Sequence, residues 1–182
     1  MLIQYGYIPE CIAQDGKWDK VSTALYIDVP SINLVKLQNA FQVYDVSSYN
    51  SAKTSTIIES IQPDYILNVQ GEILGSLILG LPKLGCINFH SGYPPDVKGT
   101  CSIVDAVLKD LPFGCSIHFM DEHIDTGEII LKKRIDPNLA SDFSDLVQKH
   151  IDAFWELAVK LLKKIEDSYP KKVASFPQEN RG

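Results

Sequence analysis

The sequence has no excess of positive charge. Its 182 residues include 17 lysines and arginines against 23 aspartates and glutamates, which gives a formal net charge of −6. Proteins that bind nucleic acids neutralise phosphates with clustered Lys and Arg, and a net negative field repels a polyanion. We therefore expect no nucleic-acid partner, and an anionic ligand would need a pocket of its own.

Cysteine pairs that bind metals or exchange electrons are also absent. The four cysteines lie far apart and none forms a CxxC pair, which argues against a zinc knuckle or a redox dithiol. Cys86 and Cys115 lie inside apolar runs, so we expect them to be buried core residues in a reducing compartment. HxH and HExxH spacings are missing too, so no metal site is expected. The weaker alternative is a metal-dependent hydrolase that uses His90, His118, His123 and Asp125.

Long hydrophobic runs are missing as well. The N-terminus has no basic region followed by an apolar stretch, as a secretory signal would have. The most apolar segment, 73–81, is interrupted by two glycines and a serine and is far shorter than the ~20 residues that cross a bilayer. We expect a cytoplasmic protein with no membrane partner.

Short apolar runs alternate with helical patterns along most of the chain. Strands are predicted at 7–13, 42–46, 64–69, 85–89, 114–120 and 127–135, and helices at 31–40, 51–61 and 100–109. This order predicts an α/β fold with a Rossmann-like, mostly parallel sheet flanked by helices. A single domain over 1–182 is expected, because a chain of this length buries roughly 70% of its unfolded surface without metals or disulfides.

A long C-terminal helix is the clearest single element. Apolar residues recur at three- and four-residue steps from Phe143 to Ile165, which predicts an amphipathic helix packed on one face of the sheet. Ser141 is expected to cap its N-terminus, with Asp142 and Asp145 near the positive end of the helix dipole. The proline-containing segment 169–182 is expected to be an extended tail.

The segment 85–99, GCINFHSGYPPDVKG, carries the first candidate for chemistry. Asn88 and His90 are two residues apart, so they leave the predicted strand on the same side, just before a Gly/Pro loop. Ligands of α/β sheets collect where strands end and loops begin. The alternative is a turn-capping Asn beside a surface histidine.

A second segment, 114–130, reads GCSIHFMDEHIDTGEII, which predicts a strand, a short acidic turn and another strand. Asp125 lies in that turn, where it would face His90 and raise its basicity by holding one tautomer. His118 is expected to be a hydrogen-bonded strand residue near the same place. An Asn, a His and an Asp would then converge.

These two segments together resemble the folate-dependent formyltransferases. The resemblance rests on INFH at Ile87–His90 with the Pro and Gly residues that follow it, and on the whole of 114–130. It extends upstream through Gln62–Leu67 and Glu72–Leu74, and covers 40–135 well. Members of that family transfer a formyl group from 10-formyltetrahydrofolate to an amine.

The resemblance implies roles for individual residues. Asn88 would polarise the formyl oxygen and hold the oxyanion, His90 would share that task and manage protons, and Asp125 would orient His90. The folate pocket would be lined by Glu72, Ile73, Leu74, His123 and Ile124. For Ile73, His123 and Ile124, ordinary core or turn positions are an equally good interpretation.

The branches of the family differ in the features that bind the acceptor, and these features indicate the acceptor of this chain. A Gly-rich loop for the phosphate of glycinamide ribonucleotide is not visible, and an acidic chain that ends soon after its long helix disfavours methionyl-tRNA. The remaining resemblance is to nucleotide-sugar N-formyltransferases, with a nucleotide-linked amino sugar as acceptor and a homodimer left open as the assembly. Acceptor contacts are expected from Ser91, Gly92, Tyr93 and Lys98.

Two departures from the family remain. After His90 relatives have Pro-Ser, whereas this chain has Ser91-Gly92, which predicts a more flexible loop. Only Met1–Gly6 precede the segment that matches the family's second strand, so the first strand and helix would be missing, unless the start lies upstream or Met1–Tyr7 is itself the strand. A shortened, catalytically silent homologue that binds folate or a partner is therefore the second hypothesis.

Overall fold

The computed structural model describes residues 23–26, 42–46, 48–69, 73–99 and 102–179. The strand predicted at 7–13, the helix predicted at 31–40 and Glu72 lie outside these residues. The chain divides into two compact units, 1–86 and 87–182. Strand β4 (Gly85–His90) begins in the first unit and continues in the second.

The first unit contains short elements that follow the predicted order. Its parallel strands β1 (Thr23–Tyr26) and β2 (Gln42–Asp45) pair with Thr23 opposite Gln42. Helix α3 (Ala52–Ile61) begins at Ser51, whose hydroxyl accepts a hydrogen bond from the Thr54 amide at 3.2 Å, and is followed by β3 (Tyr65–Val69) and α4 (Ser76–Leu79). The sequence did not predict β1.

The second unit carries an antiparallel arrangement. Strand β5 (Gly114–Phe119) pairs antiparallel with both β4 and β6 (Ile129–Arg134), and the four-stranded sheet has the order β3-β4-β5-β6. Helix α5 (Ser102–Leu108) precedes β5, and a 3-10 turn, η1 (Pro137–Leu139), precedes α6 (Phe143–Ser168). The Rossmann-like α/β fold and the long C-terminal helix are confirmed, and the antiparallel pairs make the sheet mixed.

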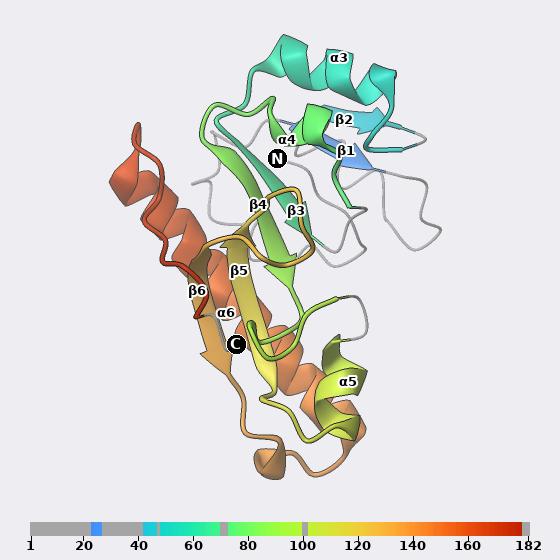
Figure 1. Ribbon diagram of the computed structural model, residues 1–182, viewed down its shortest axis with the longest axis vertical. Helices are drawn as coiled ribbons and strands as arrows, with labels where there is room; N and C mark the ends of the chain where they lie inside the picture. Colours follow the sequence, from blue (N-terminus) through green and yellow to red (C-terminus); the bar gives the residue numbers. More distant parts are fainter. Residues whose placement is uncertain (1–22, 27–41, 47, 70–72, 100–101, 180–182) are drawn as a thin grey trace. The chain divides into compact units, whose positions relative to one another are not determined.

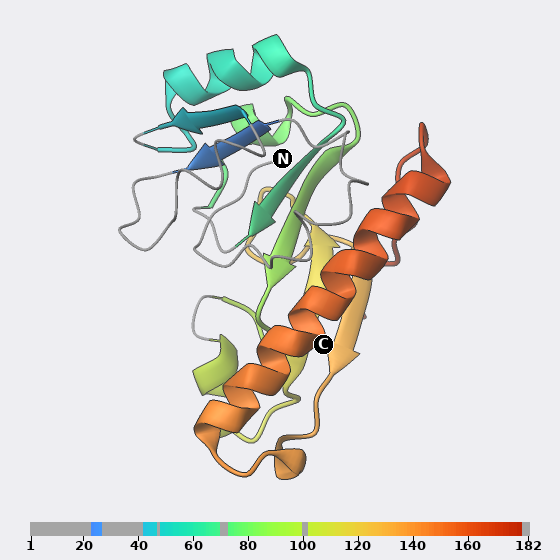
Figure 2. The same ribbon diagram turned by 180° about the vertical axis from the view of Figure 1, so that it is seen from behind.

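One face of β4 and β5 is covered by α6. Figure 2 shows α6 lying across β5 and β6, and the Phe89 and Phe154 rings meet with their centroids 5.4 Å apart. Ile117 lies opposite Phe89 in the register and is fully buried, as is Leu161 of α6. Because side chains alternate along a strand, the odd-numbered residues of β4 point toward α6 and leave Asn88 and His90 on the opposite face.

The two described cysteines are core residues. Cys86 and Cys115 are buried and unpaired, and burial raises the pKa of each thiol to about 12. A thiol held neutral in this way is inert, so neither is a candidate nucleophile. Cys11 and Cys101 lie outside the described residues.

Helix α6 begins one residue later than expected. Its N-cap is Asp142, whose Oδ1 accepts the Asp145 amide at 2.9 Å, while the Asp145 carboxylate reaches back to the Ser141 amide at 2.9 Å. The expectation that Ser141 caps the helix is therefore wrong, because the Asp142 carboxylate accepts the amide of the third helical residue, Asp145. Of the helices that the structure describes, none combines the length and the apolar character needed to span a membrane.

This cap can be tested directly. Asp142→Ala removes the acceptor for the Asp145 amide and should lower the free energy of unfolding by about 1 kcal/mol. Ser141→Ala is the matched control and should change it by less than about 0.5 kcal/mol, because the amide of residue 141 still meets Asp145. Denaturant titration of the two variants measures both. Equal losses of unfolding free energy in the two variants would contradict the assignment of the cap to Asp142.

Candidate active site

The register of β4 and β5 brings four polar side chains onto one face. Asn88 pairs with His118, and His90 pairs with Ser116, so all four lie on the side of the sheet away from α6. The His90 and His118 rings meet edge to face with centroids 5.8 Å apart. Asn88 donates from Nδ2 toward His118 Nε2 at 3.4 Å.

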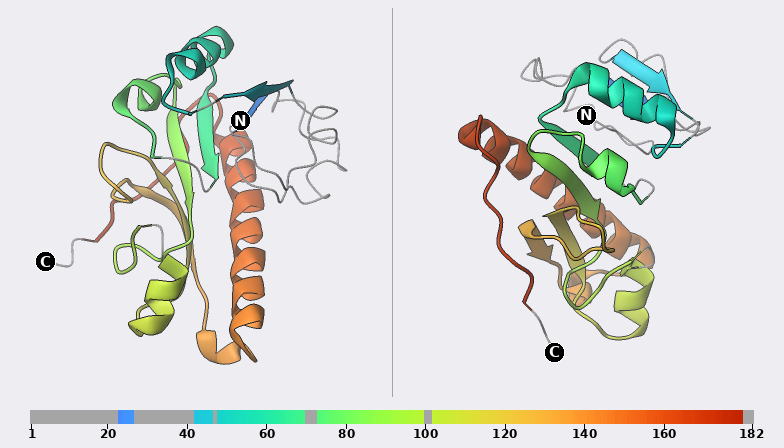
Figure 3. Two further views of the ribbon diagram at one scale, coloured as in Figure 1. Left: turned by 90° about the vertical axis from the view of Figure 1, so that its right-hand side faces the viewer. Right: turned by 45° about the horizontal axis from the view of Figure 1, so that its top comes forward.

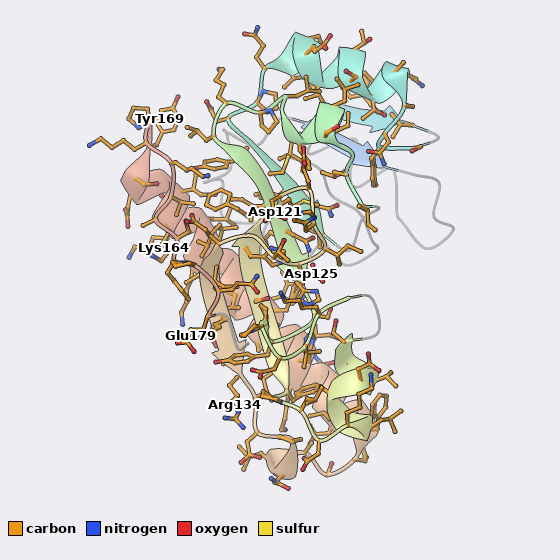
Figure 4. The ribbon with its side chains drawn as sticks, viewed as in Figure 1. Asp121, Asp125, Arg134, Lys164, Tyr169 and Glu179 are labelled. Carbon is orange, nitrogen blue, oxygen red and sulfur yellow. The ribbon has the colours of Figure 1, made fainter. Side chains whose placement is uncertain are left out.

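Asp125 reaches this face from the loop between β5 and β6. Its Oδ2 lies 3.5 Å from His90 Nδ1, and its Oδ1 lies 3.4 Å from both His118 Nε2 and Asn88 Nδ2. The contact expected between Asp125 and His90 is therefore present without an intervening residue. In Figure 4 the labelled Asp121 and Asp125 mark the loop.

The backbone around Asp125 takes an unusual shape to make these contacts. Asp125 has φ of 53°, a left-handed conformation that Asp tolerates better than most residues. Gly99, at φ 88°, donates its amide to Asp125 Oδ2 at 2.7 Å. A side chain at Gly127 would collide with the Phe119 carbonyl. Strain of this kind persists only where the surroundings hold it in place.

Asp125 is ionised throughout the physiological pH range. Burial raises the pKa of its carboxyl, but the hydrogen bond from His118, the charge of His90 and the Gly99 amide together outweigh burial and lower the pKa to about 2. A carboxylate with four polar partners around it is a fixed negative charge, and it orients the imidazoles on either side.

His90 is buried, with 6% of its surface exposed, and its Nε2 lies 3.2 Å from the Val97 carbonyl. Burial lowers its pKa below 6.5, against the opposing effect of Asp125 and the Val97 carbonyl. The ring is therefore neutral above pH 6.5 and able to take up a proton. Gly92 lies against it, and a Cβ at that position would collide with the His90 ring and the Val97 carbonyl.

His118 belongs to the site although the sequence placed it only nearby. Its Nδ1 lies 2.9 Å from the Phe119 carbonyl, so Nδ1 must carry a hydrogen, and Nε2 is left to face Asp125 and Asn88. Only the cross-strand register puts it there, and the sequence shows no register. In the sequence, the only signal for the position of His118 was the alternation of residues in the predicted strand at 114–120.

The residues expected to contact folate lie in two loops. Ile73 is 67% exposed and Leu74 is buried, and Asn50 holds their loop by accepting the Gly75 amide at 2.6 Å and donating to the Ile73 carbonyl at 2.8 Å. His123 is exposed and Ile124 is 57% exposed in the loop that carries Asp125. Their role toward a ligand stays a prediction.

The residues expected to contact the acceptor follow β4. Ser91 is half-buried and its carbonyl accepts from His150 Nε2 at 3.2 Å, while Gly92 is buried against His90. Tyr93 is half-buried under Lys132, whose Nζ lies 4.6 Å from the ring centroid, and Lys98 is exposed. The loop is thus packed at Gly92, where the sequence suggested added flexibility. Their acceptor role stays a prediction.

The described residues show no metal cluster beside these groups. Within the described ranges, no set of three or more His, Cys, Asp and Glu side chains is arranged to hold a metal ion. The chemistry available is that of an amide donor, two imidazoles and a carboxylate on one face of a sheet.

Comparison with known proteins gives these residues a family. The model of the formyl transferase family, described as "Formyl transferase", matches residues 12–160, which include Asn88, His90, His118 and Asp125. The chain belongs to this family. The matched span ends inside α6, before the C-terminal tail.

Individual relatives differ in what they act on. A methionyl-tRNA formyltransferase from Caldicellulosiruptor saccharolyticus is 33% identical over 64% of this chain and 38% of its own length, so the chain spans less than half of that relative. The formyltransferase PseJ from Anoxybacillus kamchatkensis, solved with UDP-4,6-dideoxy-4-formamido-L-AltNAc and tetrahydrofolate, has a TM-score of 0.67 at 22% identity over 88% of this chain and 84% of that one. A phosphoribosylglycinamide formyltransferase from Streptococcus pneumoniae has a TM-score of 0.69 at 22% identity over 81% and 87%. The structural matches establish a shared fold.

The buried histidines predict how stability depends on pH. Burial lowers the pKa of His90, which faces Asp125, His118, Lys98 and the Val97 carbonyl, and of His150, which faces the backbone of Ser91 and Gly114. The unfolded chain takes up protons near pH 6.5 while these folded rings do not, so the free energy of unfolding falls as pH drops below 6.5. At pH 5.5 the loss cannot exceed about 1.4 kcal/mol per histidine, the limit that protonation of the unfolded ring sets one pH unit below 6.5.

Denaturant titrations at pH 7.5 and 5.5 measure this loss. His90→Gln and His150→Gln should each reduce the difference between the two pH values. The Asp125 carboxyl stabilises the fold at both of these pH values, because its stabilisation is lost only as the pH falls from 3.8 to about 2. If the difference in unfolding free energy between pH 7.5 and 5.5 persisted in full in both the His90→Gln and the His150→Gln protein, these two histidines would not be its cause.

Proposed function

We propose that this chain transfers a formyl group from 10-formyltetrahydrofolate to an amine. The observation that carries the proposal is the convergence of Asn88, His90 and Asp125 on one sheet face, where Asp125 lies 3.4 Å from Asn88 Nδ2 and 3.5 Å from His90 Nδ1. Family membership supports the reaction class. The bound folate would supply the formyl carbon that the amine attacks.

The residues of this chain would divide the chemistry among them. The Asn88 amide would donate to the formyl oxygen as it gains negative charge, an interaction typically worth about 3 kcal/mol. His90, neutral above pH 6.5, would take the proton that the attacking amine loses and return it to the folate nitrogen that leaves. The Asp125 carboxylate would stabilise the imidazolium in between, as its position 3.5 Å from Nδ1 favours.

The surface beside Asp125 suits a folate. Ile124 directly precedes Asp125 and is 57% exposed, so an apolar side chain and a carboxylate lie next to each other in sequence and in one loop. A pterin is a flat heterocycle with hydrogen-bonding edges, and it needs this combination of apolar cover and polar partners. We propose His123 and Ile124 in this loop, and Glu72, Ile73 and Leu74 in the other, as its contacts.

For the acceptor we propose a nucleotide-linked amino sugar. The net charge of −6 opposes a tRNA, and the similarity to PseJ extends over 84% of that chain. Ser91, Gly92, Tyr93 and Lys98 are the proposed contacts. The second candidate is methionyl-tRNA, which the curated relative at 33% identity favours.

Substitutions at the three central residues test the mechanism. Asn88→Ala and His90→Ala should each lower turnover by roughly 100-fold or more and leave folate affinity within a few-fold, because interactions made only in the transition state are lost from turnover. Asp125→Asn should act alike, and double variants should be little worse than the poorer single one. Single-turnover formyl transfer and an unfolding midpoint should be measured together. An Asn88→Ala protein that is destabilised by about 1 kcal/mol yet fully active would limit Asn88 to a structural role in β4, where its amide meets Asp125 and His118.

A panel of acceptors tests the substrate. The protein is incubated with the formyl donor and, separately, a nucleoside-diphosphate amino sugar, glycinamide ribonucleotide and methionyl-tRNA, and each acceptor is examined for the mass of one added formyl group. We expect the sugar to gain it. A preference for either other acceptor would overturn the sugar assignment. If none is formylated while a folate analogue still raises the melting temperature, the silent-homologue hypothesis holds.

A further inference from the structure

The C-terminal tail runs back from α6 to the loop that carries Asp125. In Figure 1 it leaves the end of α6 and passes alongside β6, and Figure 4 labels its ends at Tyr169 and Glu179. Two backbone hydrogen bonds, of 2.8 and 2.9 Å, pair Phe176 with Ile129 at the start of β6. Val173 is buried, so the tail is anchored before it reaches the loop.

Further anchors fix the tail on the sheet. The Lys172 ammonium lies 3.8 Å from the centroid of the Phe119 ring, and the Ser175 hydroxyl donates to the Glu128 carboxylate at 2.6 Å. The left view of Figure 3 shows α6 on one side of the strands, with the loop and the end of the tail on the other. The tail thus passes around the β6 edge to the face that holds the site.

Gln178 connects this tail to the Asp125 loop. Its Nε2 donates to the Asp125 carbonyl at 2.8 Å and to the Gly127 carbonyl at 2.9 Å. A flipped amide would place Oε1 against two carbonyl oxygens, so the two acceptors determine the orientation of the side chain. Oε1 itself is buried with no donor among the described residues, which costs stability, so the donated bonds account for the placement of this amide.

The two carbonyls that Gln178 holds flank the strained part of the loop. Asp125 has φ of 53°, and Gly127 closes the turn where a larger residue would strike the Phe119 carbonyl. Within the loop, Asp121 accepts from the Thr126 hydroxyl at 2.6 Å and from the His123 amide at 3.0 Å. Gln178 adds a restraint from outside the loop at the residue that carries the carboxylate.

We infer that Gln178 is a positioning residue that sets where the Asp125 carboxylate lies relative to His90 and His118. It touches neither imidazole, and it acts through the two backbone carbonyls. The tail lies beyond the span that the family model matches, 12–160. The effect on catalysis rests on the proposed formyl transfer, whereas the effect on the position of Asp125 does not.

Histidine NMR tests the position without any substrate. The chain has four histidines, and the imidazole nitrogen signals of two of them, His90 and His118, report directly on Asp125. Gln178→Leu keeps the size of the side chain and removes the donor, so it should move these two signals at fixed pH while His150 stays in place. Ser175→Ala removes another hydrogen bond of the tail and is the matched control, with no change expected at any of the three. Unchanged His90 and His118 signals in a folded Gln178→Leu protein would overturn the inference.

Activity gives the second readout. Gln178→Leu should lower turnover about 10- to 100-fold with little change in KM for the donor, because misplacement of a group by about 1 Å costs that much. In an Asp125→Asn background the same substitution should have almost no further effect, as expected if it acts through Asp125. A full additional loss in that background would overturn the inference. Should the wild-type protein transfer no formyl group, the proposed function fails while the NMR result still decides the role of Gln178.

If Gln178 served only the stability of the fold, its variants would give a different result. If Gln178→Leu and Gln178→Glu both lose the folded state, seen as displacement of the His150 signal and of the unfolding midpoint, the residue serves stability and the inference is overturned. If Gln178→Glu stays folded, it should act like Gln178→Leu, since an oxygen replaces the nitrogen that faces the two carbonyls.

Discussion

A half-buried, ionised carboxylate is the interaction on which the rest of the site depends. Removing the Asp125 charge from water is costly, and only donors that point at it can offset that cost. Asn88 and the Gly99 amide donate to it, and the His90 and His118 rings lie beside it, so its partners come from three separate segments of the chain. Each segment must therefore adopt its observed conformation at once, and the low pKa of Asp125 reflects that joint arrangement.

The position of α6 matters to the Asn88 and His90 side chains, which lie on the opposite face of the sheet. A slip of β4 by one residue would turn Asn88 and His90 onto the helix face and expose Phe89. The contact of Phe89 with Phe154, and the hydrogen bond from His150 to the Ser91 carbonyl, oppose such a slip. Hydrophobic packing on one face of the sheet thus fixes the polar geometry on the other.

Local sequence patterns predicted the features of the fold that depend only on neighbouring residues. Hydrophobic periodicity located the described strands β2 to β6 and the long helix, because each element has its own repeat. The cap of α6 was placed one residue early, since Ser141 and Asp142 are both good caps and only the geometry chooses between them. Asn88, His90 and Asp125 were found because two motifs carried a resemblance. His118 depends on strand register, and Gln178 on a tail more than 50 residues away in sequence from Asp125, so neither shows a local signal.

The long contacts at the centre of the site also bear on how it works. Asn88 Nδ2 lies 3.4 Å from both Asp125 and His118, well beyond the roughly 2.9 Å of a strong N–H···O bond. A ligand oxygen at the usual distance would compete for these hydrogens at little cost, while the backbone restraints on Asp125 stay in place. The Asn88 amide hydrogens are therefore oriented before a ligand binds, but no strong hydrogen bond to His118 or Asp125 holds them. Such an arrangement favours a charge that develops during a reaction over one already present in the ground state.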